Sequence, residues 1–269
     1  MQQDTQQNNL HQSIEKEKEE KAKNLKTTKQ KIREDCISIT KQRIRESVKK
    51  DTMIIQAVSA VDEIDKVANI LAKRLREWYE YYNPEFSKSI ESHQKFSELI
   101  ISKNKEELLK EVGIREEESM GADLPQEDVD AIVGLAKEIF SLYRQREQLE
   151  RYIEKEMKKL CPNLSAVAGE IVGAKLLSHA GSLQRLASMT STTIQVLGAE
   201  RALFRHMKFK TKAPKHGIIL IHPLLQKAKN KGKAARAISD KISIAVKVDF
   251  FKGQFIGDKL RQELEMKIE

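Results

Sequence analysis

The residues best suited to chemistry in this chain are cations gathered in one block, from Arg201 to Arg236. Eleven residues of the block are Lys or Arg, and none is Asp or Glu. Lys and Arg neutralise phosphate groups and release counterions, and Arg adds forked hydrogen bonds and stacking. Planar side chains stand among these cations, namely Phe204, His206, Phe209 and His216. Recognition of single-stranded or irregular RNA uses this mixture, so the block predicts nucleic-acid binding.

The block also has a second flank, in which cations recur at short spacing. These are Lys227, Lys229, Lys231, Lys233 and Arg236. A basic surface that only keeps the protein in solution is the alternative interpretation, and a charge run alone would favour it. The charge distribution favours binding instead. Net charge is +5 over residues 1–50, −7 over 51–200, +11 over 201–236 and zero over the rest, so the block holds more than the whole surplus of +9.

Other residues resemble parts of a catalytic or ligand-binding site, but they lack the spacing or the neighbouring residues that such a site requires. Gly169–Lys175 has three residues between its glycines and no Ser or Thr after the lysine, so close helix packing explains it better than a phosphate-binding loop. His216 and His222 have no Cys or carboxylate nearby that would complete a zinc site. Paired carboxylates, a nucleophile elbow and a Cys–His motif are not recognisable. We therefore expect no enzymatic activity, no metal site and no cofactor.

The first segment that precedes the block, residues 1–47, is a polar arm or linker rich in Gln, Lys and Glu. Up to about Lys31 it has too few apolar residues to offset the entropy of ordering, so we expect a flexible arm or a frayed helix. Its charge is expected to serve solvation, and contact with nucleic acid is the less favoured alternative. Its first twenty residues lack the apolar core of a secretory signal.

Residues 48–160 carry the pattern of a coiled coil. Apolar residues alternate steps of three and four, which predicts a helix with one seam. The seam consists of Ile54, Ala57, Val61, Ile64, Ala68, Leu71, Leu75, Trp78 and Tyr82. Asn83-Pro84 is expected to end this helix. A second helix is predicted over 85–110 and a turn over 116–125.

A further long helix follows the turn and keeps the same phase. Its seam consists of Ile132, Ala136, Ile139, Tyr143, Ile153, Met157 and Leu160, with Arg146 and Glu150 in the middle. Two seams that flank a turn predict an antiparallel hairpin with a ridge for pairing with another copy, although either stripe alone fits an ordinary bundle core equally well. The predicted coiled-coil and dimer residues are Ile64, Leu71, Leu75, Ile132, Ile139 and Tyr143.

Cys161-Pro162-Asn163 ends the hairpin, and residues 161–269 contain shorter helical segments. Ala and Gly at close spacing in Ser165–Ala180 allow tight helix contacts. Ile218–Ile221 resembles a strand but is too short to found a sheet, so a buried loop or helix entry is expected. The predicted fold is all-α, a long antiparallel coiled-coil hairpin followed by a compact helical domain. Two cysteines exclude a disulfide scaffold, and no apolar run reaches the ~20 residues of a membrane helix, so an intracellular protein is expected.

Three segments in and after the basic block closely resemble the Nop domain. They are TIQVLGAERALFRHMK (193–208), APKHGIILIHP (213–223) and GKAARAISDKISIAVKVDFF (232–251). This domain occurs in the archaeal box C/D ribonucleoprotein scaffold, its eukaryotic nucleolar relatives and a spliceosomal protein. Residues 45–86 resemble the coiled-coil arm that precedes the domain. The resemblance fits the archaeal branch best, because the chain lacks a long Lys-rich tail.

The resemblance implies a noncatalytic RNA–protein scaffold. Members bind a box C/D guide RNA at a kink turn after a small kink-turn protein of ribosomal type has docked, and they form homodimers through the coiled coil. They position a separate methyltransferase, fibrillarin, for guide-directed 2′-O-methylation of ribosomal RNA. Neither a cofactor nor a membrane is implied. The implied location is the cytoplasm of an archaeal cell or the nucleolus of a eukaryotic one.

The resemblance also implies roles for particular residues. Residues 198–201 would lie where the RNA and the kink-turn protein meet, and 202–205 would abut the end of a guide–target duplex, with Phe204 as an apolar cap and Arg205 as a cation. His216 would stack on an exposed nucleotide, and lysines would contact phosphates. The predicted RNA-binding residues are Gly198, Glu200, Arg201, Ala202, Leu203, Phe204, Arg205, Lys208, Lys212, Lys215, His216, Lys233 and Arg236.

One departure from the family pattern concerns the amino terminus. The family's scaffolds begin with a domain that holds fibrillarin, whereas only residues 1–47 precede the coiled coil here. The expectation is a truncated or shortened relative, in which fibrillarin recruitment does not carry over. Two alternative functions are a coiled-coil interaction module whose basic face meets an acidic protein, and a splicing-particle-type scaffold with a different RNA.

Overall fold

The computed structural model describes residues 29–268, and the chain divides into two units, Met1–Lys49 and Lys50–Glu269. In the first unit, residues 29–47 form one helix in which every residue is exposed. The predicted flexible arm up to about Lys31 lies mostly outside the described residues. Residues 32–47, expected within the polar arm or linker, are helical. They are rich in Lys, Arg, Glu and Gln, which favour helix, and isoleucines such as Ile32 and Ile44 are exposed on it.

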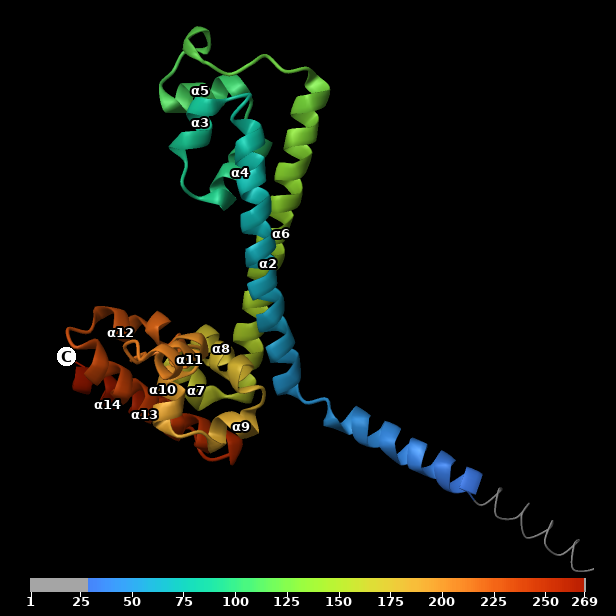
Figure 1. Cartoon of the computed structure of the whole chain (residues 1–269), viewed down its shortest axis with the longest axis vertical. Helices are drawn as coiled ribbons and strands as arrows, with labels where there is room; N and C mark the ends of the chain where they lie inside the picture. Colours follow the sequence, from blue (N-terminus) through green and yellow to red (C-terminus); the bar gives the residue numbers. More distant parts are fainter. Residues whose placement is uncertain (1–28, 269) are drawn as a thin grey trace, which may run out of the picture. The chain divides into compact units, whose positions relative to one another are not determined.

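The second unit contains two long antiparallel helices, α2 (Lys50–Tyr79) and α6 (Gln126–Leu160), which run side by side in Figure 1. Ion pairs along them show the direction of pairing. Lys50 Nζ lies 3.7 Å from Glu156 Oε2, and Arg146 Nε lies 3.0 Å from Asp65 Oδ1, so residue numbers rise along α2 as they fall along α6. The predicted helical hairpin is confirmed.

The seam between α2 and α6 contains most of the predicted residues, with one change of register. Leu75, Ile132, Ile139 and Tyr143 are buried, and Ile64 and Leu71 are half-buried. Toward the carboxyl end of α2, however, Ala72 and Tyr79 take the buried positions that were predicted for Leu71 and Trp78. An α-helix has 3.6 residues per turn, so it drifts ~20° per heptad from a strict 3.5-residue repeat, and the seam moves on by one residue.

Three short helices stand in place of the single helix predicted over 85–110. They are α3 (Pro84–Ser89), α4 (His93–Ser102) and α5 (Lys105–Val112). Polar caps divide them, because the side chains of Asn83, Ser92 and Asn104 each accept a hydrogen bond from a backbone N–H of the helix that follows. These helices lie at the turn end of the hairpin (Figure 1).

The predicted turn at 116–125 is confirmed, with only a short 3₁₀ helix, η1 (Glu116–Glu118), before α6 begins. Glu85 holds the turn, since its carboxylate accepts hydrogen bonds from Met120 N at 2.7 Å and Ser119 Oγ at 3.0 Å. Arg76 ties α3 to the hairpin by donating to the Ser87 carbonyl at 2.7 Å, with its guanidinium over the Phe96 ring.

The remaining helices form the compact part that follows the hairpin. They are α7 (Pro162–Ala168), α8 (Glu170–Ala180), α9 (Leu183–Ser188), α10 (Ser191–Val196), α11 (Glu200–Phe209), η2 (Ile218–Ile221), α12 (Pro223–Lys227), α13 (Lys231–Phe250) and α14 (Gly257–Ile268). Helix α13 packs against α7, α9, α10 and α14 and supplies much of the core. Ile54, Val58 and Met157 belong to the same core, so the base of the hairpin and the compact part share one hydrophobic interior.

A buried polar link fixes the end of α13 to the start of α7. The Asp249 carboxylate accepts hydrogen bonds from Asn163 N at 3.1 Å, Asn163 Nδ2 at 2.8 Å and Leu164 N at 2.8 Å. Asn163 Oδ1 in turn accepts from Ile256 N at 2.7 Å. The small-residue segment packs closely as predicted, because a Cβ on Gly173 would lie 3.1 Å from Met157 Cε.

Residues 29–268 contain no strand, and the all-α prediction is confirmed. The strand-like run Ile218–Ile221 is the 3₁₀ helix η2, in which Ile219 is buried while Leu220 and Ile221 are exposed, so the expectation of a buried segment holds for Ile219 alone. None of the described helices is both long and apolar enough to span a bilayer.

Candidate nucleic-acid interface

Helix α11 contains most of the predicted contact residues, and no residue of this helix is buried. Arg201, Arg205 and Lys208 are exposed along it. So are large apolar side chains: Phe204, Met207 and Phe209 are 66%, 62% and 64% exposed. A helix that exposes both cations and apolar groups to solvent has the composition of a binding surface rather than of a structural element.

The start of α11 is set by Gly198 and Glu200. Gly198 has φ +86°, and a Cβ there would lie 2.5 Å from Ile218 Cγ1, so this position requires glycine. Its N–H donates to Glu200 Oε1 at 2.7 Å. Partial burial raises the pKa of Glu200, but the hydrogen bonds from Gly198 N and from its own N–H, with His179 nearby, bring this pKa below its usual value. These two predicted contact residues therefore shape the helix entry.

The loop after α11 presents the next predicted residues. Lys210 ends the helix with φ 50°, and Lys212 and Lys215 are exposed while His216 is half-buried. Gln195 holds the end of the loop through its side chain and its main chain, since its Nε2 donates to Lys215 O at 2.7 Å and its carbonyl accepts from Gly217 N at 2.8 Å. The positions of Lys215 and His216 are thereby fixed beside α10.

The second flank lies on the segment from α12 to the first turns of α13. All five of its cations are exposed: Lys227, Lys229, Lys231, Lys233 and Arg236. The side chain of Asn230 caps α13 by accepting from Lys233 N at 3.1 Å. Helix η2, which follows the loop after α11 in the chain, packs against α10, α12 and α13.

The cations of the block have no internal counter-charges. Within the part of the chain that the structure describes, none of the eleven Lys and Arg residues between Arg201 and Arg236 forms an ion pair with a carboxylate. Elsewhere in the second unit, ion pairs between side chains are common. The block is therefore a positive surface whose charge an external polyanion can neutralise.

His222 and Cys161 have structural environments. His222 is buried; its Nε2 lies 3.0 Å from Val167 O, and its Nδ1 accepts from Leu224 N at 3.2 Å at the start of α12. Burial lowers its pKa. Cys161 is also buried, and burial, with the charges of Asp249 and Asp51, raises its pKa to about 12, so it is a thiol at neutral pH. Within residues 29–268, no three His, Cys, Asp or Glu residues gather as a metal site.

A family model described as "Nop: snoRNA binding domain, fibrillarin" matches residues 60–269. The chain belongs to the Nop family. The match covers the hairpin from the middle of α2 onward together with the whole basic block, and it confirms the resemblance seen in the sequence.

Relatives with long matches come from archaea and eukaryotes. A NOP5 family protein of Methanocaldococcus jannaschii is 39% identical over 236 residues, which cover 82% of this chain and 57% of the relative. Nucleolar protein 58 of Schizosaccharomyces pombe is 39% identical over 229 residues, or 79% of this chain and 45% of the relative. Nucleolar protein 56 of Dictyostelium discoideum is 40% identical over 235 residues, or 80% and 44%. The Nop-family chain thus spans about half the length of these relatives.

A solved structure agrees with the Nop-family fold. One chain of a crystal structure of a fibrillarin/Nop5p complex superposes with a TM-score of 0.52 and 26% identity, covering 88% of this chain and 77% of that chain.

Sequence reasoning missed the residues that hold the interface in place. Asp249 and Asn163 anchor α13 although they are 86 residues apart, and no local pattern indicates such a pair. The side chain of Ile218 leaves no space for a Cβ on Gly198, but in the sequence Ile218 was recognised only as part of an apolar run. The capping role of His222 had a signal in the sequence His222-Pro223, because proline favours the first position of a helix.

Proposed function

We propose that this Nop-family chain is a noncatalytic scaffold of a box C/D guide ribonucleoprotein, which binds kink-turn RNA together with a small kink-turn protein. One observation carries the proposal. Helix α11 has no buried residue and exposes aromatic side chains, and the helix and the loop after it expose cations that have no carboxylate partner. The match to a family model named for snoRNA binding supports RNA as the polyanion.

A composite ligand explains the mixed chemistry of α11. Arg201, Arg205 and Lys208 suit phosphates, whereas Phe204 and Met207 suit a base stack or the apolar surface of a protein. Such apolar side chains contribute little favourable free energy while they face water, and they contribute more when a ligand covers them. RNA already folded around a second protein offers both surfaces at once.

Self-association is the second part of the proposal. The predicted seam residues pack within one chain, so a dimer needs another surface. Helix α2 offers one: Val67, Ile70, Arg74, Trp78 and, just after the helix, Tyr81 lie on one face at steps of three and four and are all exposed. Apart from Arg74, which pairs with Glu77 of the same helix, the ridge is apolar or aromatic, and an exposed ridge of this composition is typical of a helix-pairing surface. We assign the homodimer contact to this ridge.

In its cell the scaffold supports guide-directed 2′-O-methylation of ribosomal RNA performed by another protein. The solved relative is a complex of Nop5p with fibrillarin, and the eukaryotic relatives are named nucleolar proteins. The same setting for this chain is the cytoplasm of an archaeon or the nucleolus of a eukaryote. Fibrillarin is a partner of the full family scaffold and is not assigned to the residues described here.

Fluorescence anisotropy with a labelled box C/D guide RNA tests the RNA proposal. Binding of the full chain is expected to require the kink-turn protein and to weaken steeply as salt rises. Phe204→Ala, Arg205→Ala and His216→Ala are each expected to weaken binding about tenfold, since each removes a stacking or phosphate contact.

Matched controls come from exposed residues of the same compact part. Phe251 is 76% exposed and Lys259 is exposed on α14, so Phe251→Ala and Lys259→Ala remove the same chemistry away from α11 and are expected to bind RNA as the unaltered chain does. Equal binding by the α11 variants would refute the site. If the Arg205→Ala variant bound RNA normally but no longer captured an acidic protein, the interaction-module alternative would be favoured.

Sedimentation analysis tests the ridge. Ile70→Glu/Tyr81→Glu is expected to convert a dimer into a monomer and to leave the fold of the single chain intact, because the two side chains are 67% and 72% exposed in it. A dimer that persists in this variant would exclude the ridge as the contact.

A further inference from the structure

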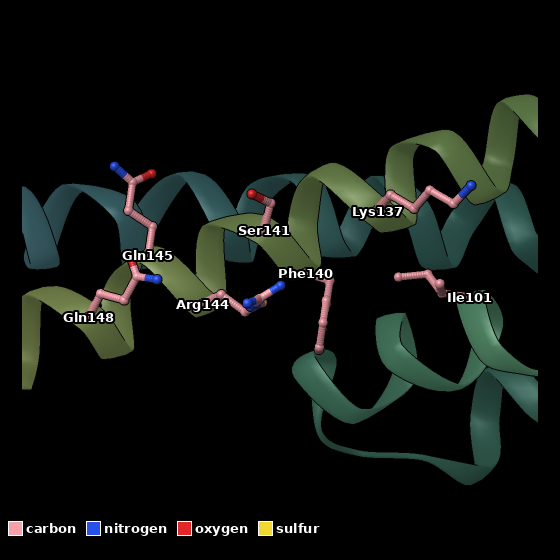
Figure 2. A pocket seen from close by; sticks show the side chains of 7 residues that line it. All are labelled: Ile101, Lys137, Phe140, Ser141, Arg144, Gln145 and Gln148. Carbon is pink, nitrogen blue, oxygen red and sulfur yellow. The ribbon is translucent and has the colours of Figure 1, made fainter.

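An open groove lies on the hairpin, outside the basic block. It occurs between α4 and α6 and is lined by Ile101, Lys137, Phe140, Ser141, Arg144, Gln145 and Gln148. Figure 2 shows the side chains of α6 following one another along the helix, with Phe140 directed toward the neighbouring helix and Ile101 opposite. Apart from Phe140 and Ile101, the lining is polar or basic.

The basic residues of this groove belong to a longer stripe on α6. Its positions follow each other at steps of four and three: Lys137, Ser141, Arg144, Gln148, Arg151, Lys155 and Lys158. All seven residues are exposed. Since residues at these steps share one face of a helix, they form a continuous line along the outside of the hairpin, here called the α6 stripe.

Charge on α6 is segregated rather than mixed. The helix contains eight Asp and Glu residues and seven Lys and Arg residues, yet the α6 stripe includes five of the cations and no carboxylate. Two stripe cations pair with carboxylates that lie outside the stripe. Arg151 Nη2 lies 3.7 Å from Glu147 Oε2, and Lys158 Nζ lies 3.3 Å from Glu170 Oε1. Among residues 29–268, no carboxylate pairs with Lys137, Arg144 or Lys155. A helix with slightly negative total charge thus presents one positive face.

The dimensions and side chains of the α6 stripe suit a nucleic-acid backbone. From Lys137 to Lys158 it extends about 31 Å, and its cations at steps of seven recur about every 10 Å. Lys, Arg, Ser and Gln are the side chains that contact phosphates and sugars without reading bases. A partner helix is a poorer fit, because the centre of a helix–helix interface is depleted of charge and the stripe has no apolar residue.

We infer that the α6 stripe is a second RNA-contact track, which holds the phosphate backbone of an RNA helix that continues beyond the segment bound at α11. The inference rests on the proposed function, since it concerns the same RNA. It assigns the hairpin a sequence-independent contact, whereas the basic block binds the kink turn. Affinity for the whole guide RNA then depends on both surfaces.

Two RNAs separate this inference from the proposed function. One is a short kink-turn RNA, and the other is the same RNA extended by a duplex arm of about 20 base pairs. Both are titrated against the full chain with the kink-turn protein at several salt concentrations. The extended RNA is expected to bind the unaltered chain about tenfold more tightly and with a steeper salt dependence.

The variant Lys137→Gln/Arg144→Gln/Lys155→Gln removes the three stripe cations that form no ion pair within the described residues, and it keeps helix-compatible side chains. It is expected to lose the tenfold advantage of the extended RNA and to lower its salt slope by about 2 to 3, while binding of the short RNA is unchanged. The matched control is Lys66→Gln/Lys73→Gln/Lys95→Gln, three exposed lysines of the same hairpin off the stripe, and it is expected to retain the advantage.

The outcomes are distinguishable. Unchanged binding of the extended RNA by the stripe variant would overturn the inference, and so would an equal loss in the control. If the stripe variant lost only capture of an acidic protein, the track would be a protein surface and the inference would be wrong. If the unaltered chain bound neither RNA, the proposed function itself would fail.

Discussion

Helices α11 and α13 lie in the same compact part, yet they differ in what holds them. Of the 20 residues of α13, nine are buried, and the Asp249 carboxylate fixes its carboxyl end. Of the ten residues of α11, none is buried. A lone helix of this length is marginal in water, because short helices owe their stability to packing. Packing therefore fixes the residues of α13, whereas the residues of α11 are free to contact a ligand.

Core truncation gives the largest expected difference between the two helices. Ile242 on α13 is fully buried, so Ile242→Ala should lower the free energy of unfolding by about 2–5 kcal/mol. Phe204→Ala on α11 should change it by less than about 0.5 kcal/mol. Urea denaturation of both variants measures this difference, and comparable losses in the two would mean that α11 is packed after all.

The glycine at the start of α11 gives the next largest effect. Gly198→Ala must adopt φ +86° and place its Cβ against Ile218, so we expect a loss of about 1–3 kcal/mol and weaker RNA binding. Gly134 in α6 has nothing within 4 Å of its Cβ direction, and Gly134→Ala should stabilise the chain by about 0.5–1 kcal/mol. Thermal melts compare the pair; stabilisation by both would show that the entry to α11 is not constrained.

Acidification gives the smallest effect and acts on His222, which is buried in the core of the compact part. Burial lowers the pKa of His222, so between pH 7 and 5 the unfolded chain takes up a proton near pH 6.5 before the folded chain does, and stability falls as the pH drops. His222→Asn retains a residue able to cap α12 and should make this fall shallower. Burial, with the nearby charges of Arg76 and Lys73, also lowers the pKa of His93 in the hairpin, so part of the slope remains. Urea midpoints at the two pH values measure it, and identical slopes would exclude His222 as a contributor.

Periodicity in the sequence predicted the long elements because their stripes are local. The steps of three and four from Ile54 onward located α2, and the turn at 116–125 followed from its Gly and Pro. The same reasoning assigned Trp78 where Tyr79 is buried, since a one-residue drift accumulates over several turns. Division of 85–110 into three helices had a signal in Asn104 and Glu107, which form a capping box.

The sequence predicted which residue types form the interface, but it did not predict how they are arranged in space. Absence of carboxylates between Arg201 and Arg236 is visible in the sequence, and so are the aromatic residues among the cations. That no residue of α11 would be buried could not be predicted, because its pattern of Leu203, Phe204 and Met207 is also that of a packed helix. Contacts such as Gly198 with Ile218 depend on tertiary structure, which no local spacing encodes.

Amide hydrogen exchange can show that α11 is a ligand-contact helix and α13 a core helix, because it reports on both helices in one sample. In the unliganded chain, α11 amides should exchange rapidly and α13 amides slowly. With the guide RNA and the kink-turn protein both present, exchange in α11 should slow at least about tenfold while exchange in α13 stays the same. Unchanged exchange in α11 when both ligands are bound would show that α11 is not the surface that contacts them.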